Sequence, residues 1–142
     1  MNINWLALVA AAILPLVTGF LWYGPLFGKA WMKESGMTEE KAKQMNPAKT
    51  YGLAVIMAFL IAFALWPEVM IGGAPTDPHG TEAYMTFKHG AFHGALMGFL
   101  IALPVLATNA LFEQKTFKYV AINAGYWIVT MALMAGIINV WT

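Results

Sequence analysis

The chain has no cysteine, no arginine and few charged residues of any kind. Without cysteine, disulfide bonds, thiolate metal ligands and thiol nucleophiles are excluded. The absence of arginine disfavours specific recognition of phosphate groups, for which the guanidinium fork is the usual donor. Charged residues make up 11% of the chain and hydrophobic residues 60%, whereas a soluble domain has about 25% charged residues. The chain therefore lacks the polar surface of a water-soluble globule, and its net charge of +1 gives no reason to expect a nucleic-acid partner.

Four long apolar segments dominate the sequence. A hydrocarbon core about 30 Å thick requires about 20 apolar residues in a helix, and residues 3–23, 51–71, 87–112 and 119–141 meet that requirement. A length of 142 residues allows one domain. We therefore predict an all-α fold in which residues 1–142 form a single four-helix transmembrane bundle. No basic residue precedes the first segment, so we expect it to be retained as a span rather than removed as a signal peptide.

The polar connector between the first two segments predicts a short amphipathic helix at the membrane interface. Trp31 is expected in the interface, with Lys29 and Lys33 directed toward lipid phosphates. Seven of the eight lysines lie in this connector (24–50) or in the short third connector (113–118). By the positive-inside rule, both connectors are predicted to be cytoplasmic and both termini to lie outside.

Small residues recur at helical spacing in the third and fourth segments. They are Gly90, Gly94, Gly98 and Ala102 in the third segment, and Gly125 and Gly136 in the fourth. In lipid, helices associate through close van der Waals contact, which small residues permit. Two interpretations of the third-segment row stay open, namely packing within one bundle and contact between subunits. Asn123 and Thr130 of the fourth segment are predicted to hydrogen-bond across helices.

The ionisable side chains suggest one candidate site. His89 and His93 lie one helical turn apart on one face of the third segment, near its outer end. With Glu68 they provide the ligand types that zinc and other divalent ions prefer, and Asp77 and His79 of the second connector lie on the same side. The pair is also compatible with a proton or small-ion path, with porphyrin ligation, or with a structural role as interfacial histidines. No cofactor is firmly implied, although a divalent metal is compatible with the pattern.

Function is constrained mainly by exclusion. The sequence shows no nucleophile paired with a base, no phosphate-binding loop and no paired carboxylates inside a span, so we expect a protein that is not an enzyme. The first hypothesis is a membrane protein that assembles as a homo-oligomer or as an accessory subunit of a larger membrane complex, through the third-segment glycines and the connector lysines. The second is a small transporter or channel formed at a subunit interface, with the histidine site at its outer mouth. The third is a metal- or pigment-binding membrane module.

Two blocks of the sequence carry a family resemblance. Residues 21–40, with WYGP at 22–25 and GKAW at 28–31, and residues 111–141, with NAGYW at 123–127, resemble the bacterial domain-of-unknown-function family seventeen sixty-one. The resemblance implies a small integral membrane protein with four spans in a bacterial inner membrane. It implies no reaction, substrate or catalytic residue, and the blocks include neither His89 nor His93.

Overall fold

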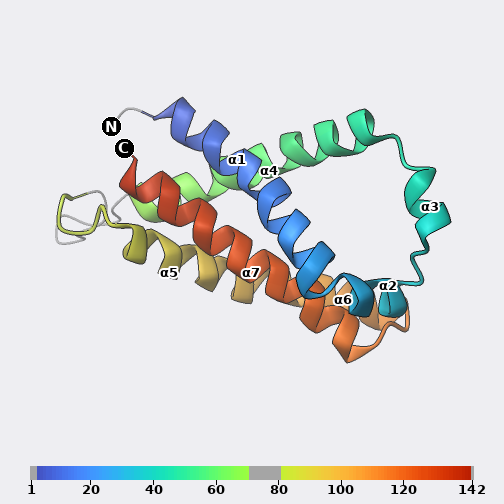
Figure 1. Cartoon of the computed structure of the whole chain (residues 1–142). Coiled ribbons are helices and arrows are strands. Elements are labelled where there is room, and N and C mark those ends of the chain that lie inside the picture. Colours follow the sequence, from blue (N-terminus) through green and yellow to red (C-terminus); the bar gives the residue numbers. More distant parts are fainter. Residues whose placement is uncertain (1–2, 71–80, 142) are drawn as a thin grey trace.

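The computed structural model describes residues 3–70 and 81–141, and all regular structure in these ranges is helical. Figure 1 shows the order of the elements along the chain. They are α1 (Trp5–Leu21), η1 (Trp22–Leu26), α2 (Gly28–Ser35), α3 (Glu39–Lys43), α4 (Pro47–Met70), α5 (Phe87–Met97), η2 (Gly98–Ala102), α6 (Leu103–Phe112) and α7 (Phe117–Val140). The predicted all-α fold class is confirmed.

Four helical stretches are long and apolar enough to cross a membrane: Trp5–Leu26, Pro47–Met70, Phe87–Phe112 and Phe117–Val140. The second and fourth begin earlier than hydropathy predicts because capping residues set their first turns. The Asn46 side chain accepts a hydrogen bond from the Lys49 backbone N–H at 3.1 Å, and Thr116 caps α7 in the same way. Side-chain caps of this kind satisfy backbone donors that the helix itself leaves unpaired.

Two of the spans contain a π-helical turn next to a proline. Pro25 lies within η1, and Pro104 follows η2 by two residues. Proline has no backbone N–H, and its ring clashes with the carbonyl four residues earlier in an α-helix. A wider turn moves that carbonyl away, so the third span continues through Pro104 as one membrane-length stretch.

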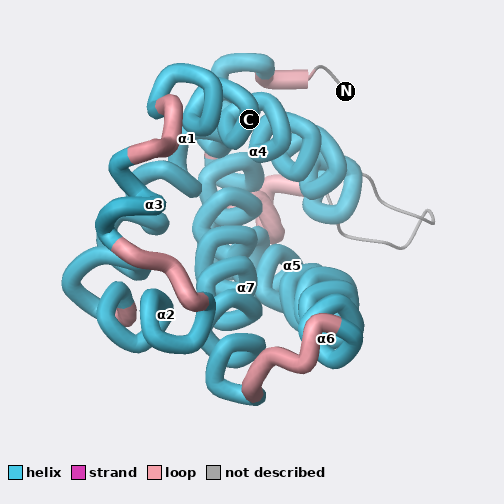
Figure 2. Tube along the Cα trace, turned by 90° about the vertical axis from the view of Figure 1, so that its right-hand side faces the viewer, coloured by secondary structure: helices cyan, strands magenta, loops and turns pink. Residues whose placement is uncertain are grey.

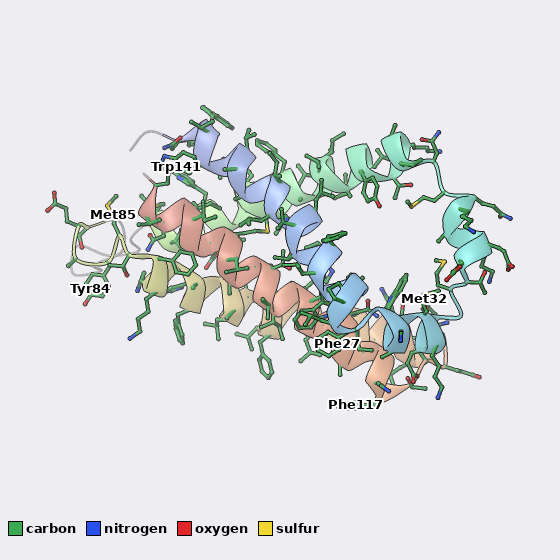
Figure 3. The ribbon with its side chains drawn as sticks, in the orientation of Figure 1. Phe27, Met32, Tyr84, Met85, Phe117 and Trp141 are labelled. Atoms are coloured by element: carbon green, nitrogen blue, oxygen red, sulfur yellow. The ribbon has the colours of Figure 1, made fainter. Side chains whose placement is uncertain are left out.

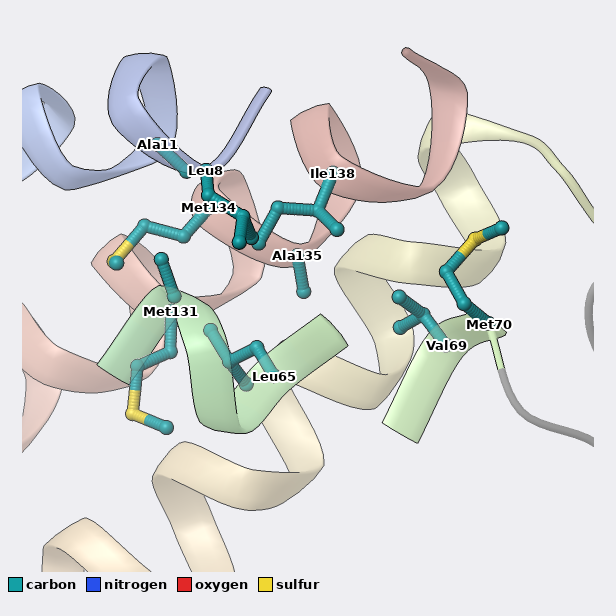
Figure 4. Close-up of a cluster of buried hydrophobic side chains, with 10 residues drawn as sticks. Leu8, Ala11, Leu65, Val69, Met70, Met131, Met134, Ala135 and Ile138 are labelled. Atoms are coloured by element: carbon teal, nitrogen blue, oxygen red, sulfur yellow. The ribbon is translucent and has the colours of Figure 1, made fainter. Parts of the chain in front are cut away.

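α7 is the central helix of the bundle, and the other spans are arranged around it (Figure 2). The buried core lies where α1, α4 and α7 meet (Figure 4). It is formed by Leu8 and Ala11 of α1, Ala62, Leu65, Val69 and Met70 of α4, and Met131, Met134, Ala135 and Ile138 of α7. These residues belong to the first half of α1 and the last halves of α4 and α7, so the core lies toward one end of the molecule.

The two ends of the molecule are built differently. One end carries Trp141, Tyr84 and Met85, and the other carries Phe27 and Phe117 (Figure 3). At the first end, the Asn4 side chain donates a hydrogen bond to the Trp141 carbonyl, which holds the two termini together. At the other end, α1 and α4 move apart, and α2 and α3 bridge the space between them (Figure 1). We call these the terminal end and the connector end.

Candidate functional site

The predicted histidine pair lies in the first two turns of α5, at the terminal end. The ring centroids of His89 and His93 are 4.6 Å apart, and the Tyr84 ring lies 5.2 Å from His89. Glu68 is exposed near the end of α4. Within residues 3–70 and 81–141, no three His, Asp or Glu side chains form a group that could hold a metal ion. The structure thus brings the two histidines together without adding Glu68 as a third ligand, while Asp77 and His79 lie outside the described residues.

The predicted glycine row of the third span packs against α7 of the same chain. A Cβ on Gly90 would collide with the Ala135 carbonyl, and one on Gly94 with the Met131 carbonyl. A Cβ on Gly98 would come within 2.7 Å of the Ile128 Cα. Ala102, the next small residue of the row, packs against the core.

This contact corrects one expectation. The glycine face is filled by the chain's own α7 and has no room for a second copy, so a contact between subunits has to use another surface. The two glycines of α7 also have neighbours within the chain. Gly136 accommodates the Phe87 ring, and Gly125 accommodates the ring of Trp22.

The predicted interfacial segment forms α2 at the connector end. Lys29 and Lys33 are exposed and lie one turn apart, whereas Trp31 falls on the opposite face of the helix. Trp31 is half-buried and contacts the Tyr23 ring edge-on, with ring centroids 5.2 Å apart. α2 is therefore amphipathic in the predicted sense, and its apolar face packs against η1.

An aromatic cluster joins the end of the first span to the start of α7. It consists of Trp22, Tyr23, Trp31 and Tyr126. The centroids of the Tyr23 and Tyr126 rings are 5.0 Å apart, and those of Trp22 and Tyr126 are 6.5 Å apart. Trp22 lies over Gly125, where an added Cβ would come within 3.1 Å of the indole ring. The π-turn η1 thus directs consecutive aromatic side chains toward α7.

Hydrogen bonds fix the polar atoms of this cluster. The Tyr23 hydroxyl donates to Asn123 Oδ1 at 2.7 Å, and the Tyr126 hydroxyl donates to the Pro15 carbonyl at 2.7 Å. Trp22 Nε1 donates to the Ile122 carbonyl at 2.9 Å. Each of these bonds joins the first span to α7. The bonds also satisfy polar groups that would be energetically costly if they were left unpaired in hydrocarbon.

A second polar contact lies deeper in the same interface. The hydroxyls of Thr18 and Thr130 are 2.9 Å apart, and Thr130 is completely buried. Asn123 and Thr130 thus hydrogen-bond across helices, as expected from the sequence. Together with the cluster, they hold the second half of the first span against α7.

A pocket of about 600 Å³ lies beside the aromatic cluster, on the side where α1 and α4 separate. It is lined by Pro15, Leu16, Gly19 and Phe20 of α1, Tyr23 and Gly24 of η1, Trp31 of α2 and Tyr51 of α4. We call it the α1–α4 pocket. Its volume falls within the range of about 300–1,000 Å³ that is usual for small-molecule sites, which are mostly apolar.

The class of protein follows from this architecture. Four apolar helices of membrane-spanning length define a multi-pass helical membrane protein. The chain belongs to the family described as "Protein of unknown function (DUF1761)", whose model matches residues 6–139. The family resemblance noted in the sequence is therefore confirmed. No curated protein and no solved structure matches the chain, so its function has to be argued from its own residues.

The aromatic cluster and the pocket are the features that sequence reasoning missed. A signal for the cluster was present, because the WYGP and NAGYW blocks that carry the family resemblance contain Trp22, Tyr23, Asn123 and Tyr126. The sequence did not indicate that these blocks face one another, since about 100 residues separate Tyr23 from Asn123. The pocket gave no signal, because Tyr51 joins its wall only through the tertiary fold.

Proposed function

We propose that this chain is a non-enzymatic protein of a bacterial inner membrane that functions by assembling, with copies of itself or as an accessory subunit of a larger membrane complex. We place the two lysine-rich connectors in the cytoplasm and both termini outside. The observation that carries the proposal is a mostly apolar hollow with two polar side chains on the outer surface of α6. Its volume is about 360 Å³, and it is lined by Pro104, Val105, Thr108 and Asn109.

The polar side chains of this hollow lie exposed on the outside of the described part of the chain. All four lining residues are exposed, and among the described residues neither the Thr108 nor the Asn109 side chain has a hydrogen-bond partner outside its own helix turn. Asn109 lies three residues before the end of α6, about 4.5 Å into the helix. Its amide therefore faces the region where the hydrocarbon of the bilayer begins.

Polar side chains in membrane spans normally face other helices, where an amide forms hydrogen bonds that lipid cannot provide. Such a bond contributes about 0.6 kcal/mol on average and about 1–2 kcal/mol in model peptides. Pro104 and Val105 add a concave apolar surface beside the amide. A helix of a neighbouring subunit would fill this hollow and satisfy Asn109 at once.

Single-cysteine cross-linking tests this contact without ambiguity, because the natural chain contains no cysteine. Thr108→Cys and Val105→Cys introduce one thiol each into the hollow, and Leu60→Cys places one on the exposed surface of α4 as a matched control. Where the neighbouring subunit is a second copy, we expect oxidation in native membranes to give disulfide-linked dimers for the two hollow variants and not for the control. Adding Asn109→Leu should weaken the cross-link, whereas Asn109→Gln, which keeps the amide, should retain it.

Equal cross-linking of all three cysteine variants would indicate random collision and would refute assembly through α6. Native mass spectrometry of the gently extracted protein then separates the two forms of the proposal. A second copy in the complex identifies a homo-oligomer, and a foreign subunit identifies an accessory role.

A small transporter or channel at the subunit interface is a second candidate, supported by the 4.6 Å separation of the His89 and His93 rings on the same span as the hollow. Flux of protons or divalent ions into vesicles containing the purified protein tests it. We expect a variant with both histidines replaced by alanine to lose that flux while the Thr108→Cys cross-link persists. Unchanged flux would remove the histidine pair from the function.

A further inference from the structure

The length of the α1–α4 pocket matches the thickness of one leaflet of the hydrocarbon core of a bilayer. Pro15 is the eleventh residue of the 22-residue first span, and Gly24 lies two residues before its end. At 1.5 Å per residue, the pocket wall between them is about 13 Å long. Half of a hydrocarbon core about 30 Å thick is about 15 Å. The pocket therefore runs from the middle of the membrane to its connector-side surface.

The lining is apolar in depth and amphipathic at the rim. Pro15 is buried and Leu16 and Gly19 are half-buried in the wall, whereas Phe20 is 76% exposed. The Tyr23 hydroxyl is engaged by Asn123 and so offers no free donor to the pocket. Trp31 and Tyr51 lie at the connector end, and Tyr51 is 51% exposed. Tyrosine and tryptophan are the residues that prefer the level of lipid headgroups.

If no atoms filled the α1–α4 pocket, its lining side chains would lose dispersion energy on their open side. The surrounding lipid is the one apolar material always present at that depth. We propose that the α1–α4 pocket binds one acyl chain of a membrane phospholipid. The tail lies along Leu16 and Gly19, and the ester and headgroup lie at the rim beside Tyr51.

Gly24 provides the test, because it lines the pocket and an added Cβ there meets nothing within 4 Å. Gly24→Leu is designed to fill the pocket. Gly52→Leu is the matched control, since Gly52 also faces open space but does not line the pocket. Leu16→Trp is a second filling variant, placed at the deep end.

The probe is a phospholipid that carries a photoactivatable diazirine near the end of one acyl chain. It is incorporated with the full chain into vesicles of phosphatidylethanolamine and phosphatidylglycerol. After illumination, adducts are located residue by residue with mass spectrometry. Ile13 and Val17 are exposed on α1 outside the pocket, and they serve as the reference for labelling by bulk lipid.

We expect adducts on Leu16 and Gly19 in the natural chain. In Gly24→Leu, labelling of both residues should fall to the level of the Ile13 and Val17 reference, and in Leu16→Trp labelling of Gly19 should fall to the same level. Gly52→Leu should keep the natural pattern. A probe with its diazirine close to the ester should shift the adducts to Trp31 and Tyr51.

Two results would overturn the proposal. In the first, both filling variants retain the pocket adducts of the natural chain, which would show that the labelling reports only surrounding lipid. In the second, a cysteine placed at Leu16 forms a disulfide between two chains, which would mean that a second copy occupies the pocket.

Discussion

Replacing Gly94 with alanine probes the contact between α5 and α7 directly. A Cβ on Gly94 would collide with the Met131 carbonyl and lie 2.8 Å from the Ala135 Cβ, whereas ordinary contacts begin near 3.4 Å. The helices must therefore separate by more than the roughly 0.6 Å that the Ala135 Cβ alone requires, because the Met131 carbonyl is nearer and cannot rotate away as a side chain could. Overpacking costs about 1–3 kcal/mol, and alanine recovers up to about 1 kcal/mol of helix propensity. Because the obstacle is backbone, we expect a net loss of about 2 kcal/mol.

The matched control is Gly52→Ala, the same chemical change on α4 with nothing within 4 Å of the new methyl group. It should leave the protein as stable as the natural chain, or slightly more stable. The assay is thermal unfolding in detergent micelles, followed by circular dichroism at equal protein concentration. We expect a lower Tm for Gly94→Ala and an equal or higher Tm for Gly52→Ala. If the two variants had the same Tm, the close packing of α5 against α7 would be wrong.

Three further tests address other parts of the structure. Tyr23→Phe removes the hydroxyl bonded to Asn123 and should cost about 0.5–1.5 kcal/mol in the same unfolding assay, whereas Tyr51→Phe should change nothing, and equal effects would contradict the assigned bond. Asn139→Leu removes two hydrogen bonds from the Asn139 side chain to backbone carbonyls at the start of α5. We expect faster backbone amide exchange in the first turn of α5, and unchanged exchange would show that the Asn139 side chain does not hold this turn. For orientation, a membrane-impermeant maleimide should label Thr81→Cys in cells whose inner membrane is intact and Gly36→Cys only after permeabilisation, and the reverse would invert the proposed topology.

The spans could be predicted from the sequence because a membrane imposes a length and a polarity that hydropathy reads directly. Their boundaries could not, because they depend on individual caps. The second helix begins at Pro47, since Asn46 accepts from a backbone N–H of the first turn. Hydropathy places this start later, because the first residues of α4 are polar.

The glycine row shows where the sequence stops being informative. Spacing alone establishes that Gly90, Gly94 and Gly98 share a helix face, but the identity of the neighbouring helix is a tertiary property. The structure supplies the neighbour, since Met131 and Ile128 of the chain's own α7 occupy the space that side chains would need. The two interpretations left open by the sequence predict the same pattern of residues, so no further reading of the pattern could have separated them.

The candidate site was harder to predict than the fold, for a similar reason. Histidines stand out in an apolar sequence because they are ionisable, and their local spacing can be read without a structure. Tyr23 and Tyr51 do not stand out, because interfacial tyrosines are common in membrane proteins. Their importance comes from the divergence of α1 and α4 at the connector end, which no local pattern encodes.

The two proposed contacts occupy different sides of the central helix. Tyr51 and Trp31 belong to elements on the side of α1, whereas Asn109 lies on α6, across α7 (Figure 2). Residues that share no partners usually act independently on stability and binding. A lipid chain in the pocket and a neighbouring subunit against α6 can therefore be present at the same time. For the same reason, a filled pocket in Gly24→Leu leaves the surface of α6 unchanged, so the acyl-chain site and the assembly surface succeed or fail separately.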